Sequence, residues 1–443
     1  MVQHAVAGAV TVQRRWASRA ASQRGQVLLQ VATQLRQHAD RIARLLTAEQ
    51  GKPYQQSLAE VEYAASFFTW FGEQARRIEG RLAPHPDGDR HFVIEHKPLG
   101  VAGLITPWNF PLAQGAKKIS AALAAGCAAV WKPSEWTPLT ALCVAPLLQK
   151  AGVPDGLVQI LPGLGAQVGN ALAQHPDVRL VSVTGSVATG SKVMQAAAAD
   201  LKRVSLELGG NAPFIILPDA DLDQVADQLI VLKTFVSGQV CVTANRIYVP
   251  QAIVTPLTQK LSSRLDQLRI GNGLDPQVQM GPLIHAQAVE NVQRLVSDAI
   301  QQGAKIIGQN RRFQASSDLR QENFCPAILL GDVRDDMTIA RQEIFGPVLP
   351  LITYQRPVDV VQAANDTPYG LAAYVYGSDL AVCHAIARQL EVGIVGINEW
   401  RPLKAEIPFG GVKQSGFGSE GGYEGLHEYQ TTQVISMPHP KLP

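Results

Sequence analysis

Cys241 lies in the stretch FVSGQVCVTANR, residues 235–246, and its thiol is either a nucleophile or a small buried side chain. A deprotonated thiol is a strong nucleophile toward carbonyl carbon. A free cysteine is more commonly a small, buried, apolar side chain. Taken alone, Cys241 therefore favours the buried role, and only the other motifs of the sequence can support the nucleophile.

Two further residues have side chains that would assist such a nucleophile. Glu207, in SLELGGN (205–211), interrupts an apolar run; if it is buried there, its pKa is raised and its carboxylate can act as a general base. Asn109, in TPWNFP (106–111), lies between prolines that fix the loop, and its amide can donate to a developing oxyanion. The alternatives are a glutamate on a solvated strand face and an ordinary turn asparagine.

Two glycine-containing stretches are candidates for phosphate binding. Gly185 and Ser186, in VTGSVATG (183–190), end an expected strand where a helix begins, so they form either a phosphate site or a plain helix cap. GLGAQVG (163–169) has one residue too many for the dinucleotide fingerprint. For it, a turn that starts a helix is an equally good interpretation.

WKPSEW, residues 131–136, ends another expected strand. Open α/β sheets bind ligands at the carboxyl ends of their strands. There, Lys132 and Glu135 can hydrogen-bond ribose hydroxyls. The alternative is a surface turn set by Pro133.

Short apolar runs alternate with helical segments from residue 100 onward, which predicts parallel, doubly wound sheets in two tandem α/β domains. Before them, the pattern predicts helices over 26–49 and from about 53 to 79, then an exposed strand at 91–98 that belongs to a projecting hairpin. The expected sheet strands are 101–106, 127–131, 157–161, 179–184, 203–208, 213–217 and 246–249. The helices that follow the first two strands are expected to end at Gly126 and Gly152.

The composition of the 443 residues is that of a globular protein, with 46% hydrophobic and 17% charged residues. A net charge of +2 predicts neither nucleic-acid nor membrane-surface binding. The five cysteines show no metal-site or disulfide spacing, which predicts no metal and a reduced, cytoplasmic setting. The opening MVQHAVAGAV lacks the basic region of a signal peptide, and no apolar run reaches membrane-spanning length.

Seven motifs in series resemble the aldehyde dehydrogenase superfamily, and further stretches resemble its succinate-semialdehyde dehydrogenase branch. The superfamily motifs are PWNFP, KPSE, TGS, ELGG, GQVC, EIFGP (343–347) and PFGGVKQSG (408–416). The branch features are LTAEQGKP (46–53), YAASFFTWF (63–71), SLELGGNAPFI (205–215) and GPLI (281–284).

The resemblance implies a hydrolytic mechanism in which Cys241 attacks an aldehyde. Asn109 and the Cys241 backbone N–H hold the resulting oxyanion, hydride passes to a nicotinamide, and Glu207 activates the water that hydrolyses the thioester. The resemblance counts Lys132 with the catalytic residues as well. It assigns cofactor binding to Thr106, Trp108, Lys132, Ser134, Glu135, Gly185, Ser186, Glu207, Leu208, Glu343 and Phe345. Because a carboxylate at Glu135 would repel a 2′-phosphate, we expect NAD in preference to NADP.

The domain organisation implied by the resemblance is an NAD-binding domain, a catalytic domain and a small β oligomerisation arm. Residues 1–79 and 99–208 form the first, which 412–429 rejoin; residues 209–411 form the second; 80–98 and 430–443 form the arm. The arm predicts a homodimer or homotetramer. The family carries a further strand-bearing stretch before its first helix, so we expect the NAD-binding domain to be short at its N-terminus.

The expected substrate pocket departs from the succinate-semialdehyde branch. Phe235 and Lys117 stand where the branch has arginines, and Leu403 stands where it has a serine. Trp400 and Arg401 make the loop before PFGG bulkier than usual. The substrate residues expected are Lys117, Phe235, Trp400, Arg401, Leu403 and Phe409.

A small anionic semialdehyde such as succinic semialdehyde is the predicted substrate, with Lys117 or Arg401 as its anion clamp. Three alternatives stay open. They are a dehydrogenase for neutral or aromatic aldehydes, a coenzyme A-dependent acylating relative, and a non-catalytic NAD-binding protein. Glu207 speaks against the acylating relative, which needs no base to activate water.

Overall fold

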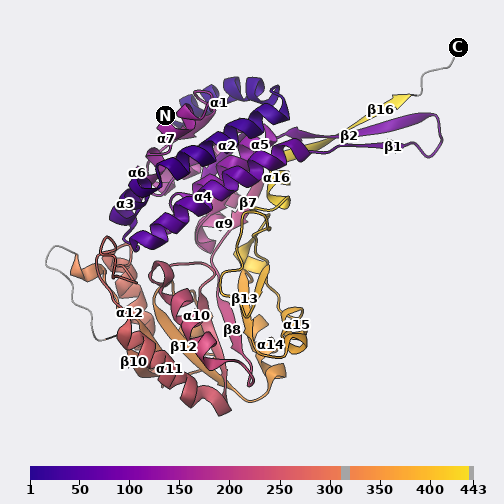
Figure 1. Ribbon diagram of the computed structural model, residues 1–443. Helices are drawn as coiled ribbons and strands as arrows, with labels where there is room; N and C mark the ends of the chain where they lie inside the picture. Colours follow the sequence, from indigo (N-terminus) through magenta and orange to yellow (C-terminus); the bar gives the residue numbers. More distant parts are fainter. Residues whose placement is uncertain (311–319, 439–443) are drawn as a thin grey trace.

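The computed structural model describes residues 1–310 and 320–438 and has two α/β domains with a projecting β arm (Figure 1). The predicted fold class is therefore confirmed. The first domain is uppermost in Figure 1, the second lies below it, and the arm extends to the right. Residues 439–443 of the predicted arm and 311–319 of the predicted catalytic domain lie outside the described residues. The exact domain boundaries stay a prediction.

The first domain is built on a six-stranded sheet in the order β15-β7-β6-β3-β4-β5. All neighbours in it are parallel except β15, which pairs with β7 in antiparallel register. β3 and β4 are buried along their full length, which explains their continuous apolar sequences. The strands are β3 Val101–Ile105, β4 Ala128–Lys132, β5 Val158–Ile160, β6 Val178–Thr184, β7 Arg203–Glu207 and β15 Gly416–Phe417.

Helices cover this sheet, and two of them are shorter than the sequence predicts. The helix expected over 26–49 is interrupted at His38, whose backbone is non-helical, and the helix expected before Gly152 is likewise two pieces. The helix α5 ends as predicted at Gly126, which has the left-handed φ of 94°. The helices are α1 Val2–Ala17, α2 Ala21–Gln37, α3 Ala39–Gln50, α4 Tyr54–Gln74, α5 Ala113–Ala125, α6 Pro138–Leu142, α7 Ala145–Lys150, α8 Asn170–Gln174, α9 Val187–Ala198 and α16 Glu424–His427.

The second domain is built on a seven-stranded sheet in the order β10-β11-β12-β9-β8-β13-β14, parallel except at the edge strand β10. Its strands are β8 Ala212–Ile216, β9 Ala244–Pro250, β10 Lys305–Gln309, β11 Ile328–Val333, β12 Val348–Tyr354, β13 Ala372–Tyr376 and β14 Ile394–Ile397. Its helices are α10 Leu222–Thr234, α11 Val254–Gln267, α12 Ala286–Gln301, α13 Thr338–Arg341, α14 Pro357–Asn365 and α15 Leu380–Ala387.

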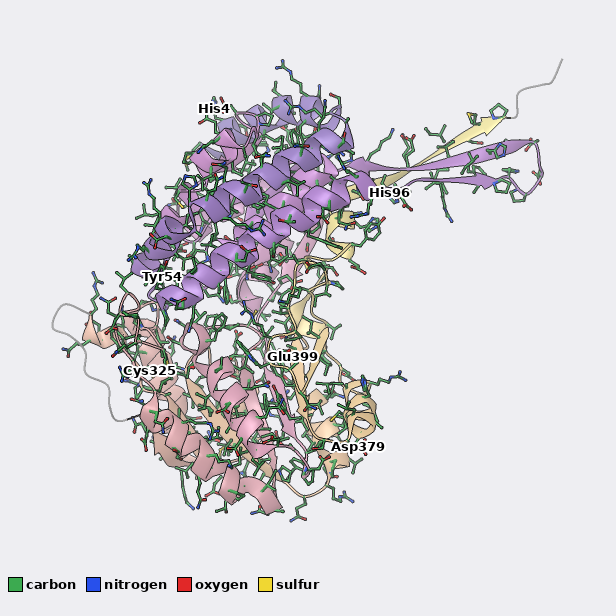
Figure 2. All side chains as sticks on the ribbon, in the orientation of Figure 1. His4, Tyr54, His96, Cys325, Asp379 and Glu399 are labelled. Atoms are coloured by element: carbon green, nitrogen blue, oxygen red, sulfur yellow. The ribbon has the colours of Figure 1, made fainter. Side chains whose placement is uncertain are left out.

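The projecting arm is a three-stranded antiparallel sheet, as the hairpin signal predicts. The strands β1 Arg81–Pro84 and β2 Arg90–Pro98 form the hairpin, and β16 Gln430–Pro438 pairs with β2 along its whole length. His96 lies on β2 at the base of the arm (Figure 2), where its ring is 5.3 Å from that of His427 on α16.

Within the described parts of the chain, none of the helices combines the length and apolarity needed to cross a bilayer.

The first helix, α1, is packed firmly onto the first domain through Trp16. This side chain is fully buried, and its indole N–H donates to the carbonyl of Leu123 on α5 at 2.8 Å. α1 is therefore an integral part of the fold rather than an exposed appendage.

We expect Trp16→Ala to lower the free energy of unfolding of the first domain by about 3–5 kcal/mol, because it opens a cavity and removes a buried hydrogen bond. Urea unfolding followed by circular dichroism measures the change. Arg15→Ala, at an exposed position of the same helix, is the matched control and should change stability by less than about 0.5 kcal/mol. A loss below about 1 kcal/mol for Trp16→Ala would contradict the tight packing of α1.

Candidate active site

Cys241 lies where two cavities between the domains meet. The first, here called the aromatic cavity, contains all of the expected substrate residues. The second, here called the strand-end cavity, lies at the carboxyl ends of β6 and β7. Cys241 and Gln114 border both. The aromatic cavity is lined by Gln56, Ala59, Glu60, Tyr63, Phe110, Ala113, Gln114, Lys117, Leu232, Phe235, Val240, Cys241, Val242, Trp400, Arg401, Pro402, Leu403 and Phe409. The strand-end cavity is lined by Pro107, Trp108, Asn109, Gln114, Thr184, Gly185, Ser186, Glu207, Leu208, Gly209, Cys241, Glu343 and Phe345.

The backbone around Cys241 is tightly constrained. Three consecutive residues ahead of it, Val236, Ser237 and Gly238, have left-handed φ values of 49°, 58° and 75°. Strained backbone of this kind persists only where the surrounding structure holds it, and it is concentrated at functional sites. On the other side, a Cβ at Gly210 would overlap the Cys241 carbonyl oxygen, so the second glycine of ELGG is required for the close approach.

Burial disfavours the ionised form of the Cys241 thiol. Desolvation, reinforced by the negative charge of Glu343, raises the pKa of Cys241 to about 12. The thiol is therefore protonated at neutral pH, and its attack on a carbonyl requires a base that removes the proton.

Glu207 ends β7 and borders the same cavity as Cys241. It is 1% exposed, and neither carboxylate oxygen has a hydrogen-bond partner within the described residues. Burial, and secondarily the charge of Glu420, raises the pKa of Glu207 well above its ordinary value of 4.5. The buried glutamate predicted from the sequence is confirmed, and the solvated-face alternative is wrong.

Asn109 connects its loop directly to the cysteine-bearing segment. Its side-chain amide donates to the carbonyl of Gln239 at 2.9 Å, and its own amide oxygen accepts from the N–H of Phe110 at 3.1 Å. The side chain is thus fixed in orientation and faces the chain two residues before Cys241. This is the arrangement expected of a preorganised donor rather than of a free turn residue.

The substrate residues predicted from the sequence all line the aromatic cavity. The ring of Phe235 lies 5.8 Å from that of Phe110 and 6.1 Å from that of Trp400, which makes an aromatic wall. Tyr63 and Gln56 of α4 also line this cavity, although the sequence analysis assigned them no role. The only signal in the sequence for Tyr63 is that it lies in the branch-specific stretch 63–71, and Gln56 lies outside all of these stretches.

The charge of Lys117 is matched inside the protein, which the sequence did not reveal. Its ammonium group pairs with one carboxylate oxygen of Glu420, while Lys118 pairs with the other and donates to Ser182 at 2.8 Å. Lys117 also lies over the ring of Phe409, 4.6 Å from its centre. By contrast, no carboxylate in the described part of the chain pairs with the guanidinium of Arg401.

The residues expected to bind the cofactor fall into two groups. One group borders the strand-end cavity and contains Trp108, Gly185, Ser186, Glu207, Leu208, Glu343 and Phe345. The ring of Phe345 is 5.6 Å from that of Trp108, and Glu343 accepts from the N–H of Gly210 at 3.1 Å. Ser186 is the N-cap of α9, its hydroxyl accepting from the N–H of Thr189, and phosphate binding at Gly185 and Ser186 stays a prediction.

The other group lies at the ends of β3 and β4, outside the lining of the two cavities. Lys132 and Glu135 form an ion pair at 2.7 Å. The hydroxyl of Thr106 accepts from the indole of Trp131 at 2.8 Å, and that of Ser134 accepts from the Trp136 N–H at 3.2 Å. Lys132 thus lies with the ribose candidate Glu135 and not with the lining around Cys241.

These residues fit a dinucleotide cofactor. The N-terminus of α9 and Gly185 border the cavity, where backbone N–H groups can bind a phosphate. A Cβ built at Gly185 would lie 3.8 Å from Thr189, an ordinary contact distance, so the protein itself does not crowd this point. The buried hydroxyl of Thr184 lines the same cavity without a partner in the described residues, as expected of a group that awaits a polar ligand. No group of three or more potential metal ligands occurs in the described segments.

The raised pKa of Glu207 implies that the free energy of unfolding depends on pH. Between the ordinary carboxyl pKa and the raised folded-state pKa, the folded protein holds one more proton than the unfolded chain. The free energy of unfolding therefore falls as pH rises through this window, by up to about 1.4 kcal/mol per pH unit. In Glu207→Gln, this loss should disappear, so the variant gains stability relative to the natural chain as pH rises.

Urea unfolding at a series of pH values from 5 to 9 tests this prediction. Glu73→Gln, at an exposed position on α4, should keep the pH dependence of the natural chain. Parallel pH profiles for the natural chain and Glu207→Gln would contradict the raised pKa.

Known proteins match this chain over nearly its whole length. The family model described as "Aldehyde dehydrogenase family" matches residues 1–435. A probable succinate-semialdehyde dehydrogenase of Sinorhizobium fredii, whose name specifies NADP(+), is 42% identical over 434 residues, 98% of this chain and 87% of that protein. A glutarate-semialdehyde dehydrogenase of Pseudomonas aeruginosa is 40% identical over 422 residues, 95% of this chain and 86% of that protein.

A solved structure agrees with the fold as closely. The crystal structure of betaine aldehyde dehydrogenase from Staphylococcus aureus in complex with NAD+ superimposes with a TM-score of 0.96 at 35% identity, covering 100% of this chain and 88% of that one. The family match, the identities and the shared fold lead to one conclusion: the chain belongs to the aldehyde dehydrogenase family.

Proposed function

We propose that the protein oxidises a small anionic semialdehyde, such as succinic semialdehyde, to the carboxylic acid with NAD(P). The observation that carries the proposal is the position of Cys241 at the junction of the two cavities. From there, its sulfur can reach an aldehyde carbon held in the aromatic cavity. The strand-end cavity, with α9 and Glu343, would receive the cofactor.

The first half of the reaction forms a bond between the Cys241 sulfur and the aldehyde carbon. Glu207, whose raised pKa makes its carboxylate a stronger base than an ordinary one, takes the thiol proton and later releases it to water. Negative charge develops on the aldehyde oxygen, where the Asn109 amide and the Cys241 N–H would donate to it. One such donor contributes about 3–4 kcal/mol to transition-state stabilisation. The bound nicotinamide supplies the hydride acceptor.

The second half of the reaction releases the product. Once hydride has left, the acyl group is a thioester of Cys241. The Glu207 carboxylate removes a proton from water as the water oxygen attacks the thioester carbon. The carbon–sulfur bond then breaks, the thiol regains a proton, and the carboxylic acid leaves. Glu207 supports this hydrolytic route over an acylating one.

Arg401 is our candidate for recognition of the substrate's distal carboxylate. The ammonium of Lys117 is paired with Glu420, whereas Arg401 lines the same cavity with no carboxylate partner in the described residues. Relatives named for succinate and glutarate semialdehydes also support an anionic substrate. The aromatic wall of Phe235 and Trp400 favours the second candidate, a neutral or aromatic aldehyde.

An assay of NADH and NADPH formation with succinic semialdehyde, hexanal and benzaldehyde tests the proposal. We expect the highest kcat/KM for succinic semialdehyde and no measurable turnover in Cys241→Ala. Arg401→Gln should lower kcat/KM for succinic semialdehyde about 10- to 100-fold, because a charged hydrogen bond contributes about 1.5–3 kcal/mol, and should leave hexanal nearly unchanged.

Arg388→Gln, at an exposed position that ends α15, is the matched control. A preference for hexanal or benzaldehyde would reject the anionic substrate, and loss of activity toward all three aldehydes in Arg401→Gln would reject its role in carboxylate recognition. If the natural chain oxidises none of the three aldehydes, the proposed enzymatic function is rejected.

The expected preference for NAD over NADP has to be relaxed to NAD(P). The Sinorhizobium relative is named for NADP(+), whereas the Staphylococcus structure contains NAD+. In this chain, Glu135 is paired with Lys132, whose ammonium partly offsets the repulsion of a 2′-phosphate. The pairing of protein copies through the arm, as a dimer or tetramer, and a cytoplasmic location both stay predictions.

We expect Glu135→Gln to raise the ratio of kcat/KM for NADP to that for NAD about tenfold or more. The substitution removes a negative charge and leaves Lys132 free to attract the 2′-phosphate. Initial rates with both cofactors give this ratio. An unchanged ratio would show that Glu135 does not contact the adenosine ribose.

A further inference from the structure

We propose that Gln56 and the buried Lys52–Glu60 pair are positioning residues that hold Asn109 and Cys241 in register. All three belong to α4 or to the turn before it, and none has a place in the mechanism given above. The inference rests on the proposed roles of Asn109 and Cys241 in holding an oxyanion.

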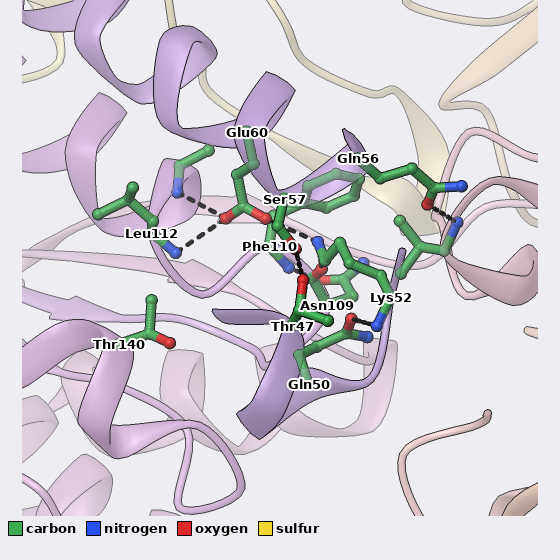
Figure 3. A network of polar contacts seen from close by, with 12 residues as sticks. Thr47, Gln50, Lys52, Gln56, Ser57, Glu60, Asn109, Phe110, Leu112 and Thr140 are labelled. Atoms are coloured by element: carbon green, nitrogen blue, oxygen red, sulfur yellow. Dashed lines mark hydrogen bonds and ion pairs between the residues drawn. The ribbon is translucent and has the colours of Figure 1, made fainter. Parts of the chain in front are cut away.

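Lys52 and Glu60 form a fully enclosed ion pair beside the loop that carries Asn109 (Figure 3). Both side chains are 0% exposed, and their charged atoms are 2.6 Å apart. The Lys52 ammonium also donates to the Asn109 backbone carbonyl at 2.6 Å and lies 4.3 Å from the centre of the Phe110 ring. The lysine therefore contacts the loop at the residue proposed to hold the oxyanion.

Glu60 fixes the next stretch of the same loop. Its second carboxylate oxygen accepts from the N–H groups of Leu112 and Ala113, at 2.9 and 3.0 Å. These N–H groups at the start of α5 are buried and have no acceptor within the helix, and a carboxylate there caps the helix. Although Glu60 borders the aromatic cavity, both of its oxygens are already engaged. It therefore acts on the loop rather than on a substrate.

Gln56, one helical turn before Glu60, binds the cysteine-bearing segment of the other domain. Its side-chain oxygen accepts from the N–H of Val236 at 2.9 Å, and its amide donates to the Gln279 carbonyl at 3.3 Å. Val236 is β-branched and has a φ of 49°, a conformation that costs energy and needs support from its surroundings. Gln56 supplies part of that support.

One end of α4 thus contacts both halves of the proposed oxyanion site. Asn109 belongs to the first domain and Cys241 to the second. A small relative shift of the domains would therefore prevent the Asn109 amide and the Cys241 N–H from donating to the same aldehyde oxygen. Misplacement by about 1 Å can cost about 100-fold in rate. A buried ion pair also contributes little to stability compared with apolar residues of the same size, which is consistent with a positional role.

Kinetics of two variants, each with and without Asn109→Ala, test the proposal. Gln56→Ala removes the bond to Val236, and Lys52→Met combined with Glu60→Gln removes the ion pair without leaving an unmatched buried charge. We expect kcat with succinic semialdehyde to fall about 10- to 100-fold in each, with KM changed less than about threefold. In the Asn109→Ala background, the same substitutions should lower kcat by less than about threefold.

Alkylation of Cys241 by iodoacetamide provides a readout that forms no oxyanion. Its rate should stay within about threefold of the natural chain in all variants, which separates positioning of the donor from general damage to the thiol. Gln55→Ala, at the exposed neighbouring position, is the matched control and should keep the natural kcat. If the double variant does not fold, Gln56→Ala alone decides.

Several outcomes would overturn the inference while leaving the proposed function intact. They are an unchanged kcat, a full additional loss in the Asn109→Ala background, an effect confined to KM, and a parallel fall in alkylation rate. Absence of aldehyde oxidation by the natural chain, or natural activity in Asn109→Ala, would instead reject the proposed function and remove the basis of the inference.

Discussion

The burial of an ionisable carboxyl at the end of β7 is the constraint on which much of the site depends. Glu207 has no hydrogen-bond partner in the described residues, so its charged form is costly. This cost raises the pKa of Glu207, and the nearby ammonium groups of Lys117 and Lys118, which flank Glu420, offset part of it. The consequence is a carboxylate that is a stronger base than an ordinary glutamate, at the expense of stability as pH rises.

A second constraint follows from the two-domain architecture. The attacking sulfur and the amide proposed to hold the oxyanion lie in loops of different domains, so no single element aligns them. Gly210 and the left-handed backbone before Cys241 permit the close approach of the ELGG segment to the cysteine. The first turns of α4 and the turn before it contact both the Asn109 loop and the segment before Cys241. Preorganisation here is a property of the domain interface rather than of either domain.

The aromatic cavity combines two recognition chemistries. Its wall of Phe110, Phe235 and Trp400 suits an apolar chain, whereas Arg401 at the same cavity offers a cation. Because Lys117 is already paired with Glu420, the anion-binding task would fall to a loop arginine instead of a helix lysine. A short semialdehyde, with a few methylene groups between its aldehyde and its carboxylate, satisfies both parts of the cavity.

Local sequence determined the elements and the candidate residues. Apolar runs marked the buried strands, Gly126 marked the end of α5, and the awkward position of Glu207 in an apolar run signalled burial. The break between α2 and α3 at His38 was missed, because the helical spacing of apolar residues continues across it. Only the tertiary structure decided which charges are matched and which segments touch. The pairing of Lys117 with Glu420, and that of Gln56 with Val236, join residues about 300 and 180 positions apart, and such contacts depend on how the sheets and helices pack.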